Sequence, residues 1–409
     1  MGDTPHMYAA IPGSPTTLLK ALAAGSMVVF LSCFTARYTH CLKPHGDPMD
    51  IDVKVGLAAR NTVEVVTVEE LRKVFEEKPR PRGYIGFEPS GLVHVGWLVW
   101  MFKVRDLVKA GVDFHILEAT WHAYINDKLG GDMELIRKAA RYTRIVLDAI
   151  GVPESSVKYI DAEELASDKD YWATLLRAAK HTSLARVRRA LTIMGRRMDE
   201  GETDFSKLIY PLMQVTDIFY LDLDIALGGM DQRKAHMLTR DIAERLGRRK
   251  PVAIHTPIIT GLQGPGERMG GGEYDEVAAS VKMSKSKPET AVFVHDSPEA
   301  VEAKILKAYC PPRTVEFNPI VEINKYLLFQ QEGFKLVVER PEKYGGTIIV
   351  ENYADLEKMY VNGEIHPLDL KKATANALNK LLDPIRRRIE SDPEARGVLE
   401  ELSKAKITR

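Results

Sequence analysis

Cysteine is scarce in this chain, and neither sign of charge is in excess. Three of the 409 residues are cysteines, Cys33, Cys41 and Cys310, and none forms a C-x-x-C pair. This excludes a disulfide framework and a four-cysteine zinc site, favours a reducing cytoplasm, and leaves the thiols as inert side chains. Lys and Arg number 57, as do Asp and Glu, so the formal net charge is zero. A protein that coats nucleic acid indiscriminately is thereby excluded, and any such partner must meet local patches.

Long apolar runs and the common nucleotide-binding fingerprints are also missing. The apolar run Ala21–Phe34 is shorter than the roughly 17–25 residues that span a membrane, so we expect no membrane partner. A signal-peptide core behind Lys20 is one interpretation, although no A-x-A cleavage site stands out. The alternative is that Met49 is the natural start and that residues 1–48 are a disordered or non-native extension. Neither G-x-G-x-x-G nor G-x-x-x-x-G-K-[ST] occurs.

The rest of the chain has the composition and patterning of an α/β protein. Apolar residues make up 45% and charged residues 28%, as in ordinary globular domains, and the length suits two or three domains. Short apolar segments alternate with amphipathic helices, which is typical of parallel βαβ units. Strands are expected at Tyr84–Phe87, Val112–Ala119, Val157–Ile160, Ile225–Leu227, Val252–Ile254 and Val292–Val294. Helices are expected at Val68–Lys78, His94–Leu107, Met133–Ile150, Gln232–Leu246 and Pro298–Ala308. We therefore predict a Rossmann-like α/β domain with a parallel sheet over 49–308 and a smaller, mostly helical domain over 309–409.

The first candidate site is the segment Gly86–Trp97, which follows the first parallel strand and opens a helix. Open α/β sheets bind ligands at the carboxyl ends of their strands. Its glycines allow close approach to a nucleotide, and His94 lies at a helix N-terminus, where backbone N–H groups favour phosphate. A simple turn with a helix-capping histidine is the structural alternative.

The second candidate site is the segment Lys282–Lys287, with three lysines and two serines. It follows two glycine-rich stretches, Gly264–Gly266 and Gly270–Gly272. A hinge before a cationic, hydroxyl-bearing segment suits a loop that closes over a polyphosphate. An exposed basic turn is the alternative.

The third candidate site is a polar stripe on a predicted helix. Tyr210, Gln214 and Asp217 are spaced i, i+4 and i+7, so they share one helix face. Their neighbours are too apolar for a solvated face, which favours the wall of a pocket. The segment Gly228–Lys234 follows on the next predicted strand and helix.

Together and in this order, these motifs resemble those of class I aminoacyl-tRNA synthetases. Residues 94–97 are similar to the HIGH signature, and residues 282–286 match KMSKS letter for letter. The similarity is greatest to the tyrosyl-tRNA synthetases of archaea and eukaryotes and covers residues 60–390. It rests on Y-I-G-F-E-P-S-G at 84–91, Y-P-x-M-Q-x-x-D at 210–217, G-M-D-Q-R-K at 229–234 and A-Y-C-P at 308–311.

The chain departs from this family pattern at two places. Trp97 replaces the second histidine of HIGH, so that His94 must do more or Trp97 must stack or pack there. The loop before KMSKS, Gly261–Val281, is longer than in the archaeal pattern, and we expect its closing motion to differ.

The resemblance implies that L-tyrosine and ATP react to tyrosyl-adenylate, and that the tyrosyl group passes to the 3′ end of tRNA(Tyr). The implied catalytic residues are His94, Gly96, Lys282 and Lys285. The implied tyrosine-binding residues are Tyr84, Tyr210, Gln214, Asp217 and Gln232. The implied ATP-binding residues are Gly86, Glu88, Pro89, Ser90, His94, Gly96, Trp97, Lys282, Met283, Ser284, Lys285 and Ser286. Mg²⁺ is expected to arrive with ATP, and no structural metal is expected.

The same resemblance implies a homodimer. It also makes the first domain a nucleotide-binding catalytic domain that includes the KMSKS loop, and the second an anticodon-binding domain. The implied tRNA contacts are Arg233, Lys234, Tyr344, His366 and Asp369. Further phosphate-binding candidates are expected on one helical stretch and near the C-terminus, although charge runs are usually solvated faces. They are Lys180, Arg186, Arg188, Arg189, Arg196 and Arg197, together with Arg386, Arg387 and Arg388.

Three alternatives stay open on the sequence. A tryptophanyl-tRNA synthetase shares the architecture but needs a partner for an indole N–H. A small-molecule nucleotidylyltransferase can carry a HIGH-like turn, although KMSKS and the extra helical domain weigh against it. An RNA-binding protein without catalysis is favoured by Trp97 and disfavoured by the two signature lysines.

Overall fold

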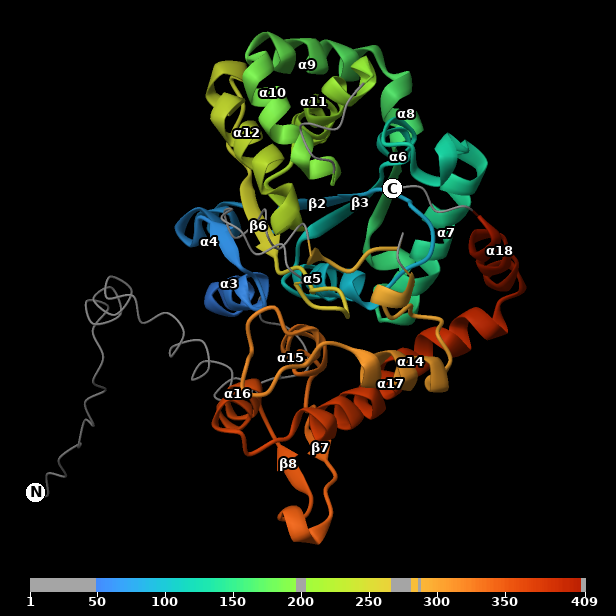
Figure 1. Cartoon of the computed structure of the whole chain (residues 1–409). Helices are drawn as coiled ribbons and strands as arrows, with labels where there is room; N and C mark the ends of the chain where they lie inside the picture. The colour runs from blue at the N-terminus through green and yellow to red at the C-terminus, as the bar shows by residue number, and fades with distance from the viewer. Residues whose placement is uncertain (1–48, 196–203, 266–280, 286–287, 406–409) are drawn as a thin grey trace, which may run out of the picture. The chain divides into compact units, whose positions relative to one another are not determined.

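A six-stranded sheet is the centre of the part of the chain that the computed structural model describes, residues 49–195, 204–265, 281–285 and 288–405 (Figure 1). The strand order is β1-β6-β5-β2-β3-β4. The strands are β1 Glu64–Val66, β2 Arg82–Phe87, β3 Asp113–Glu118, β4 Lys158–Asp161, β5 Ile225–Gly229 and β6 Val252–Thr256. Strands β2 to β6 pair in parallel, which confirms the predicted α/β fold, whereas β1 adds an unpredicted antiparallel edge.

The strand order reverses beside β2, and this reversal positions the site. Strands β3 and β4 lie on one side of β2, while β5 and β6 lie on the other. On the second side, Gly83 and Tyr84 of β2 pair with Ile225 and Ala226 of β5. Such a switch point leaves a crevice at the carboxyl ends of the strands, where α/β proteins bind their ligands.

The helices of the first 250 residues follow the predicted alternation. Helix α4 begins with a capping box between Thr67 and Glu70 and ends before Pro79, as its sequence predicts. Helix α5 buries Leu98, Met101 and Leu107 completely. The helices are α3 Ile51–Ala59, α4 Val68–Glu77, α5 Leu98–Lys109, α6 Thr120–Ile125, α7 Met133–Ala149, α8 Ala162–Ser167, α9 Lys169–Lys180, α10 Leu184–Ala190, α11 Phe205–Tyr220 and α12 Arg233–Ala243.

Two sequence predictions about these elements are wrong. The basic residues from Lys180 onward do not share one helix, because α9 ends at Lys180 and α10 begins at Leu184 after a break at residues 181–183. Val292–Val294 does not form a strand of the sheet, and its contact with the first site is an isolated bridge between Phe293 and His94. Predictions for residues 1–48, Arg196, Arg197, Ser286 and most of the loop before KMSKS lie outside the described residues.

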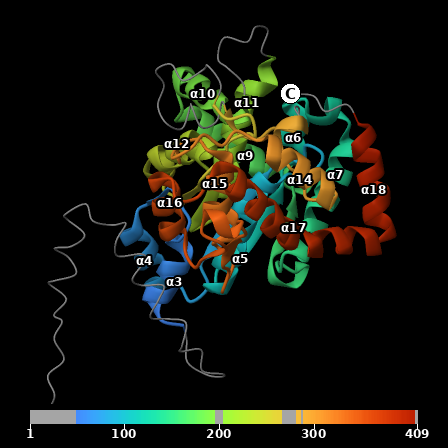
Figure 2. The ribbon, with the colours of Figure 1, turned by 60° about the horizontal axis from the view of Figure 1, so that its bottom comes forward.

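The C-terminal part is mostly helical, as predicted, with one small hairpin. Its elements are α14 Pro298–Lys307, α15 Pro319–Ile323, η9 Asn324–Leu328, β7 Leu336–Val338, β8 Ile348–Val350, α16 Tyr353–Asn362, α17 Pro367–Ser391 and α18 Pro393–Lys404. Figures 1 and 2 both show α18 beside α7, where Lys138 and Glu401 form an ion pair at 2.6 Å. Residues 50–409 cluster as one compact unit, so the domain boundary at 308 stays a prediction. Among the described residues, no helix has the length and apolar character to span a membrane.

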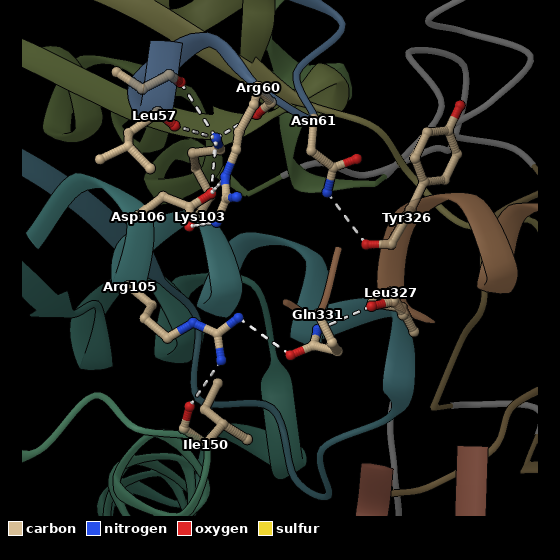
Figure 3. Close-up of polar contacts among 11 residues, drawn as sticks. Leu57, Arg60, Asn61, Lys103, Arg105, Asp106, Ile150, Tyr326, Leu327 and Gln331 are labelled. Carbon is tan, nitrogen blue, oxygen red and sulfur yellow. Dashed lines mark hydrogen bonds and ion pairs between the residues drawn. The ribbon is translucent and has the colours of Figure 1, made fainter. Parts of the chain in front are cut away.

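A buried lysine joins the first helix to the sheet-packing helix α5 (Figure 3). Lys103 Nζ donates to the carbonyl oxygens of Leu57 at 3.0 Å and Ala58 at 3.3 Å, and it lies 3.3 Å from Asp106 Oδ2. Burial lowers the pKa of Lys103 to about 8. The ammonium thus satisfies carbonyls at the C-terminus of α3 that have no partner within the helix.

Candidate active site

The predicted site residues come together at the carboxyl ends of β2, β3 and β5. The turn after β2 carries Glu88, Ser90 and His94, and α6 follows β3. The 3₁₀ helix η5 (Met230–Gln232) follows β5. Helix α11 completes the site with Tyr210 and Asp217, and the segment 281–285 brings the KMSKS lysines to it.

A buried carboxylate, Asp217, is the centre of the proposed tyrosine pocket. Asp217 is 1% exposed, and Tyr171 donates from its hydroxyl to Asp217 Oδ1 at 2.8 Å. His122 Nε2 lies 3.2 Å from Oδ2 of the same carboxylate. Burial, reinforced by the charge of Asp217, raises the pKa of Tyr84 well above its ordinary value. A carboxylate has about four lone-pair positions, so Asp217 can accept a further hydroxyl.

Gly86 makes room for the Tyr84 hydroxyl. A Cβ atom at Gly86 would lie only 2.8 Å from Tyr84 Oη. Any side chain at this position would therefore push the phenol away from its place beside Asp217. The glycine is needed for this close approach.

Glu88 holds a second tyrosine of the site. Tyr210 donates from its hydroxyl to Glu88 Oε1 at 2.6 Å, and Asn126 Nδ2 donates to the same oxygen at 2.9 Å. Lys128 Nζ lies 3.6 Å from Glu88 Oε2. Burial, followed by the charge of Glu88, raises the pKa of Tyr210 well above its ordinary value. Tyr210 is therefore a neutral hydrogen-bonding group, and Glu88 fixes its orientation.

The two glutamines of the predicted pocket differ in their partners. Gln214 Oε1 is buried and has no hydrogen-bond partner among the described residues. Gln232 Nε2 donates to the carbonyl oxygen of Ile193 at 3.2 Å. A buried amide oxygen without a partner costs roughly 1–3 kcal/mol, so Gln214 is suited to accept a hydrogen bond from a ligand such as an ammonium group.

His94 caps the short helix η1 (Val95–Trp97). The helix-capping role considered for this histidine in the sequence is therefore observed. Its Nδ1 accepts the backbone N–H of Gly96 at 3.2 Å. Burial, followed by the charges of Lys285 and Lys282, lowers the pKa of His94 well below its ordinary value. A neutral ring that accepts at Nδ1 carries its proton on Nε2, which leaves one N–H for a ligand oxygen.

The two lysines of the KMSKS segment have different surroundings. Lys282 Nζ lies 2.7 Å from Asp231 Oδ2, and the carboxylate raises the pKa of this lysine. Lys285 is 7% exposed and donates to Ser90 Oγ at 3.0 Å. Burial lowers the pKa of Lys285 well below its ordinary value. Among the described residues, the ion pair with a carboxylate is formed by Lys282, whereas Lys285 binds a hydroxyl.

Trp97 packs against the second of these lysines. Lys285 Nζ lies 3.5 Å from the centroid of the Trp97 ring, which is a close cation–π contact. The Trp97 ring also makes an edge contact with Phe87 at 5.9 Å. The tryptophan that replaces the second histidine of HIGH therefore packs against its neighbours, which is one of the two possibilities that the sequence left open.

Arg233, a predicted tRNA contact, is held by the edge strand β1. Its Nε donates to Glu64, which also accepts from His255 Nδ1 at 2.8 Å. His255 Nε2 lies 2.9 Å from His236 Nδ1 within the buried interior. Burial lowers the pKa of His255 to about 4, so the ring is neutral and Glu64 remains the charged partner of Arg233.

The other predicted tRNA residues lie away from this cluster or at its rim. Tyr344 is 63% exposed on the short helix η10 (Glu342–Tyr344). His366 caps α17 by accepting the backbone N–H of Leu368 at 3.2 Å, and Asp369 lies in the first turn of that helix. Lys234 is partly exposed at the start of α12.

Five site residues are absent from the sequence-based prediction of the site. Asp231 lies inside a quoted motif without an assigned role, and His122 is interpreted there as a core or helix-start residue. Tyr171 occurs in an ordinary amphipathic helix, where periodicity indicates burial but not the neighbour that the hydroxyl reaches. The five residues are His122, Asn126, Lys128, Tyr171 and Asp231.

Comparisons with known proteins find close similarity over most of the chain. The family described as tRNA synthetases class I (W and Y) matches residues 76–383. A tyrosine–tRNA ligase of Aeropyrum pernix is 62% identical over 362 residues, which are 88% of this chain and 99% of that protein. The crystal structure of the tyrosyl-tRNA synthetase from Aeropyrum pernix has a TM-score of 0.77 at 57% identity and covers 86% of this chain and 99% of that one. The tyrosyl-tRNA synthetase from Pyrococcus horikoshii, complexed with L-tyrosine, has a TM-score of 0.79 at 41% identity and covers 86% and 100%.

Proposed function

The chain belongs to the class I tRNA synthetases of the tryptophan and tyrosine group, and we propose the following roles for its site residues in tyrosine activation and transfer. Its function is that of a tyrosine–tRNA ligase, an aminoacyl-tRNA synthetase that uses ATP. The observation that carries the proposed roles is the buried Asp217 carboxylate beside Tyr84 of β2, the strand that leads into the turn where Ser90 binds the KMSKS residue Lys285.

In the first step, a carboxylate oxygen of L-tyrosine attacks the α-phosphorus of ATP. A new carboxyl–phosphate bond forms while the bond to the bridging oxygen of the leaving pyrophosphate breaks. The enzyme forms no covalent bond, so its contribution is alignment of the reactants and stabilisation of charge. Binding groups for both reactants must therefore be rigid, and the hydrogen bonds of Glu88 and Asp217 support that requirement.

Tyrosine selection depends on the phenol hydroxyl. Asp217 accepts a hydrogen bond from it, and the Tyr84 hydroxyl is the second group beside it. Tyr210, Gln214 and Gln232 bind the ammonium group and ring edge of the substrate. Phenylalanine lacks this hydroxyl and leaves the buried carboxylate without one of its donors. Tyrosine-specific synthetases with such a site discriminate against phenylalanine by a factor of about 10⁵.

The phosphates of ATP bind at the turn after β2 and at the KMSKS segment. His94 donates from Nε2, and the backbone around Gly96 contributes N–H groups. Lys282 and Lys285 move from Asp231 and Ser90 to the β- and γ-phosphates and neutralise the leaving pyrophosphate. Gly86, Pro89, Ser90, Trp97, Met283, Ser284 and Ser286 complete the nucleotide site. Mg²⁺ enters as a complex with ATP and is bound mainly by its phosphates.

In the second step, a hydroxyl of the terminal ribose of tRNA(Tyr) attacks the tyrosyl carbonyl and AMP leaves. Arg233 and Lys234 contact the acceptor end of the tRNA. Tyr344, His366 and Asp369 recognise the anticodon, because an exposed ring can stack on a base and a carboxylate can accept from a base edge. A cytoplasmic homodimer is the assembly that the family resemblance supports.

Amino-acid-dependent exchange of pyrophosphate into ATP tests these roles. We expect exchange with L-tyrosine and none above background with L-phenylalanine or L-tryptophan. Exchange driven by tryptophan alone would instead support the tryptophanyl member of the group. Loss of tyrosine-dependent exchange in Asp217→Ala, with the fold retained, would support the assigned pocket.

A further inference from the structure

A largely buried acid outside the pocket, Glu322 on α15, contacts the base of the KMSKS segment. Its Oε2 accepts the backbone N–H of Thr260 at 2.7 Å, and its Oε1 accepts from Thr260 Oγ1 at 3.1 Å. Thr260 is itself only 2% exposed. Burial raises the pKa of Glu322 to about 7, so the chain keeps an acid where its charge is disfavoured.

Thr260 is the direct partner of a signature lysine in an isolated antiparallel bridge. It pairs with Lys282, and two backbone hydrogen bonds flank the pair. Gly261 N donates to Val281 O at 2.8 Å, and Met283 N donates to Ile259 O at 3.1 Å. The position of Thr260 therefore sets the position from which the KMSKS segment extends.

The segment that carries Glu322 is fixed to the sheet domain at other points (Figure 3). Asn61 Nδ2 donates to the carbonyl oxygen of Tyr326 at 3.2 Å, and Arg105 donates to Gln331 Oε1 at 3.2 Å. Glu322 thus extends from a held backbone toward Thr260. A mobile surface helix would not transmit a fixed position in this way.

We propose that Glu322 is a positioning residue for the KMSKS segment: by binding both donors of Thr260, it fixes the bridge from which Lys282 and Lys285 reach the phosphates of ATP. This inference rests on the proposed roles of those two lysines. A carboxylate suits the task because each oxygen accepts one donor and no N–H group is left without a partner. The expected consequence is selective for the nucleotide side of the reaction.

The test compares Glu322→Ala, Glu322→Gln and Thr260→Val in the full-length enzyme. Single-turnover adenylate formation and the KM for ATP are measured, together with the Kd for L-tyrosine. We expect Glu322→Ala to slow adenylate formation or raise the KM for ATP about tenfold, since small misplacements of aligned groups cost such factors. The tyrosine Kd should change less than about twofold, and Glu322→Gln, which retains an acceptor, should recover most of the loss.

Two further variants separate positioning from general destabilisation. Glu316→Ala removes an exposed acid nearby and should behave as the wild type. Adding Thr260→Val to Glu322→Ala should cause little further loss, because both changes break the same contact. Wild-type ATP kinetics in a folded Glu322→Ala enzyme would overturn the inference, as would equal losses for ATP and tyrosine. A wild-type enzyme without tyrosine-dependent exchange would instead overturn the proposed roles themselves.

Discussion

Lys282 Nζ lies 2.7 Å from Asp231 Oδ2, so the first lysine of KMSKS has a carboxylate partner within the protein. The contact keeps the lysine charged, because the carboxylate raises its pKa. In the proposed mechanism, binding of ATP exchanges this carboxylate partner for a phosphate. Lys285 contacts the Ser90 hydroxyl and the face of Trp97, and burial lowers its pKa.

We predict that Lys285→Ala slows adenylate formation about 10²–10³-fold, the range for loss of one group that stabilises charge in a transition state. Its ammonium lies on the nucleotide side of the site, so tyrosine binding should persist. Single-turnover quench flow with radiolabelled ATP measures the first quantity, and equilibrium dialysis measures the second. Normal adenylation in this variant would show that the assignment of the KMSKS lysine is wrong.

Trp97 should act through its ring. Trp97→Phe keeps an aromatic face for Lys285, whereas Trp97→Ala removes the 3.5 Å cation–π contact. Such contacts contribute roughly 0.5–2 kcal/mol, so the alanine variant should lose about two- to thirtyfold in kcat/KM for ATP. Expressed as free energy, the loss of kcat/KM in the phenylalanine variant should be less than half of the loss in the alanine variant. Equal kinetics for the two variants would contradict a role for the ring.

Discrimination against phenylalanine should depend on the surroundings of Asp217 as well as on the residue itself. Asp217→Ala should abolish tyrosine activation. Tyr171→Phe removes the 2.8 Å hydrogen bond to Oδ1 and leaves the carboxylate less firmly held. One such bond to a charged group contributes roughly 1.5–3 kcal/mol, so the ratio of tyrosine to phenylalanine activation should fall at least about tenfold. Tyr220→Phe, which removes a hydroxyl bonded to Asp168 instead, is the matched control.

Glu64→Gln should separate transfer from activation. The substitution replaces the charged partner of Arg233 with a neutral one, while neither residue touches the tyrosine pocket described above. We expect pyrophosphate exchange to be unchanged and kcat/KM for tRNA aminoacylation to fall about tenfold, because a charge-assisted contact is weakened. Glu69→Gln, on the neighbouring helix α4, serves as the surface control. Equal or faster aminoacylation would show that Glu64 does not position Arg233.

The pH dependence of stability should carry a contribution from Glu322. Its folded pKa of about 7 lies above the ordinary value of 4.5, so the folded state holds the extra proton between these values. Stability from this group therefore falls as pH rises toward 7 and above. Lys325 offsets part of the effect, while the nearby Tyr353 is neutral in this range. As the pH is raised from 5.5 to 8.5, the free energy of unfolding of Glu322→Gln should increase relative to that of the wild type by at most about 2 kcal/mol, measured by urea unfolding. A difference in the free energy of unfolding that does not change with pH would contradict this prediction.

The parallel sheet could be predicted from the sequence because its strands are continuous apolar runs between amphipathic helices. Strand β1 could not, since three half-buried residues give too short a pattern, and its pairing depends on the cross-strand neighbour His255. The break between α9 and α10 was missed because alanine, leucine and arginine on both sides favour helix. Only Ser183 marks the boundary, through local backbone geometry.

In the candidate site, too, some residues could be predicted from the sequence and others could not. Tyr210, Gln214 and Asp217 could be grouped because they share a helix face, and the lysines could be assigned through KMSKS. Contacts such as Tyr171 with Asp217 depend on tertiary packing across 46 residues, and periodicity carries no information about them. Trp97 is the most informative departure, because the sequence left stacking and packing open and the structure shows the ring against Lys285.

The contact between Lys285 and Ser90 also bears on how the protein folds. It joins residues 195 positions apart in the chain, and strands β3 to β6 lie between them. Contacts of such long sequence separation form late, because the loop that they close is entropically costly. During synthesis the pocket for the amino acid can therefore assemble before the nucleotide side is complete. A nascent chain should acquire affinity for tyrosine before it acquires the ability to react with ATP.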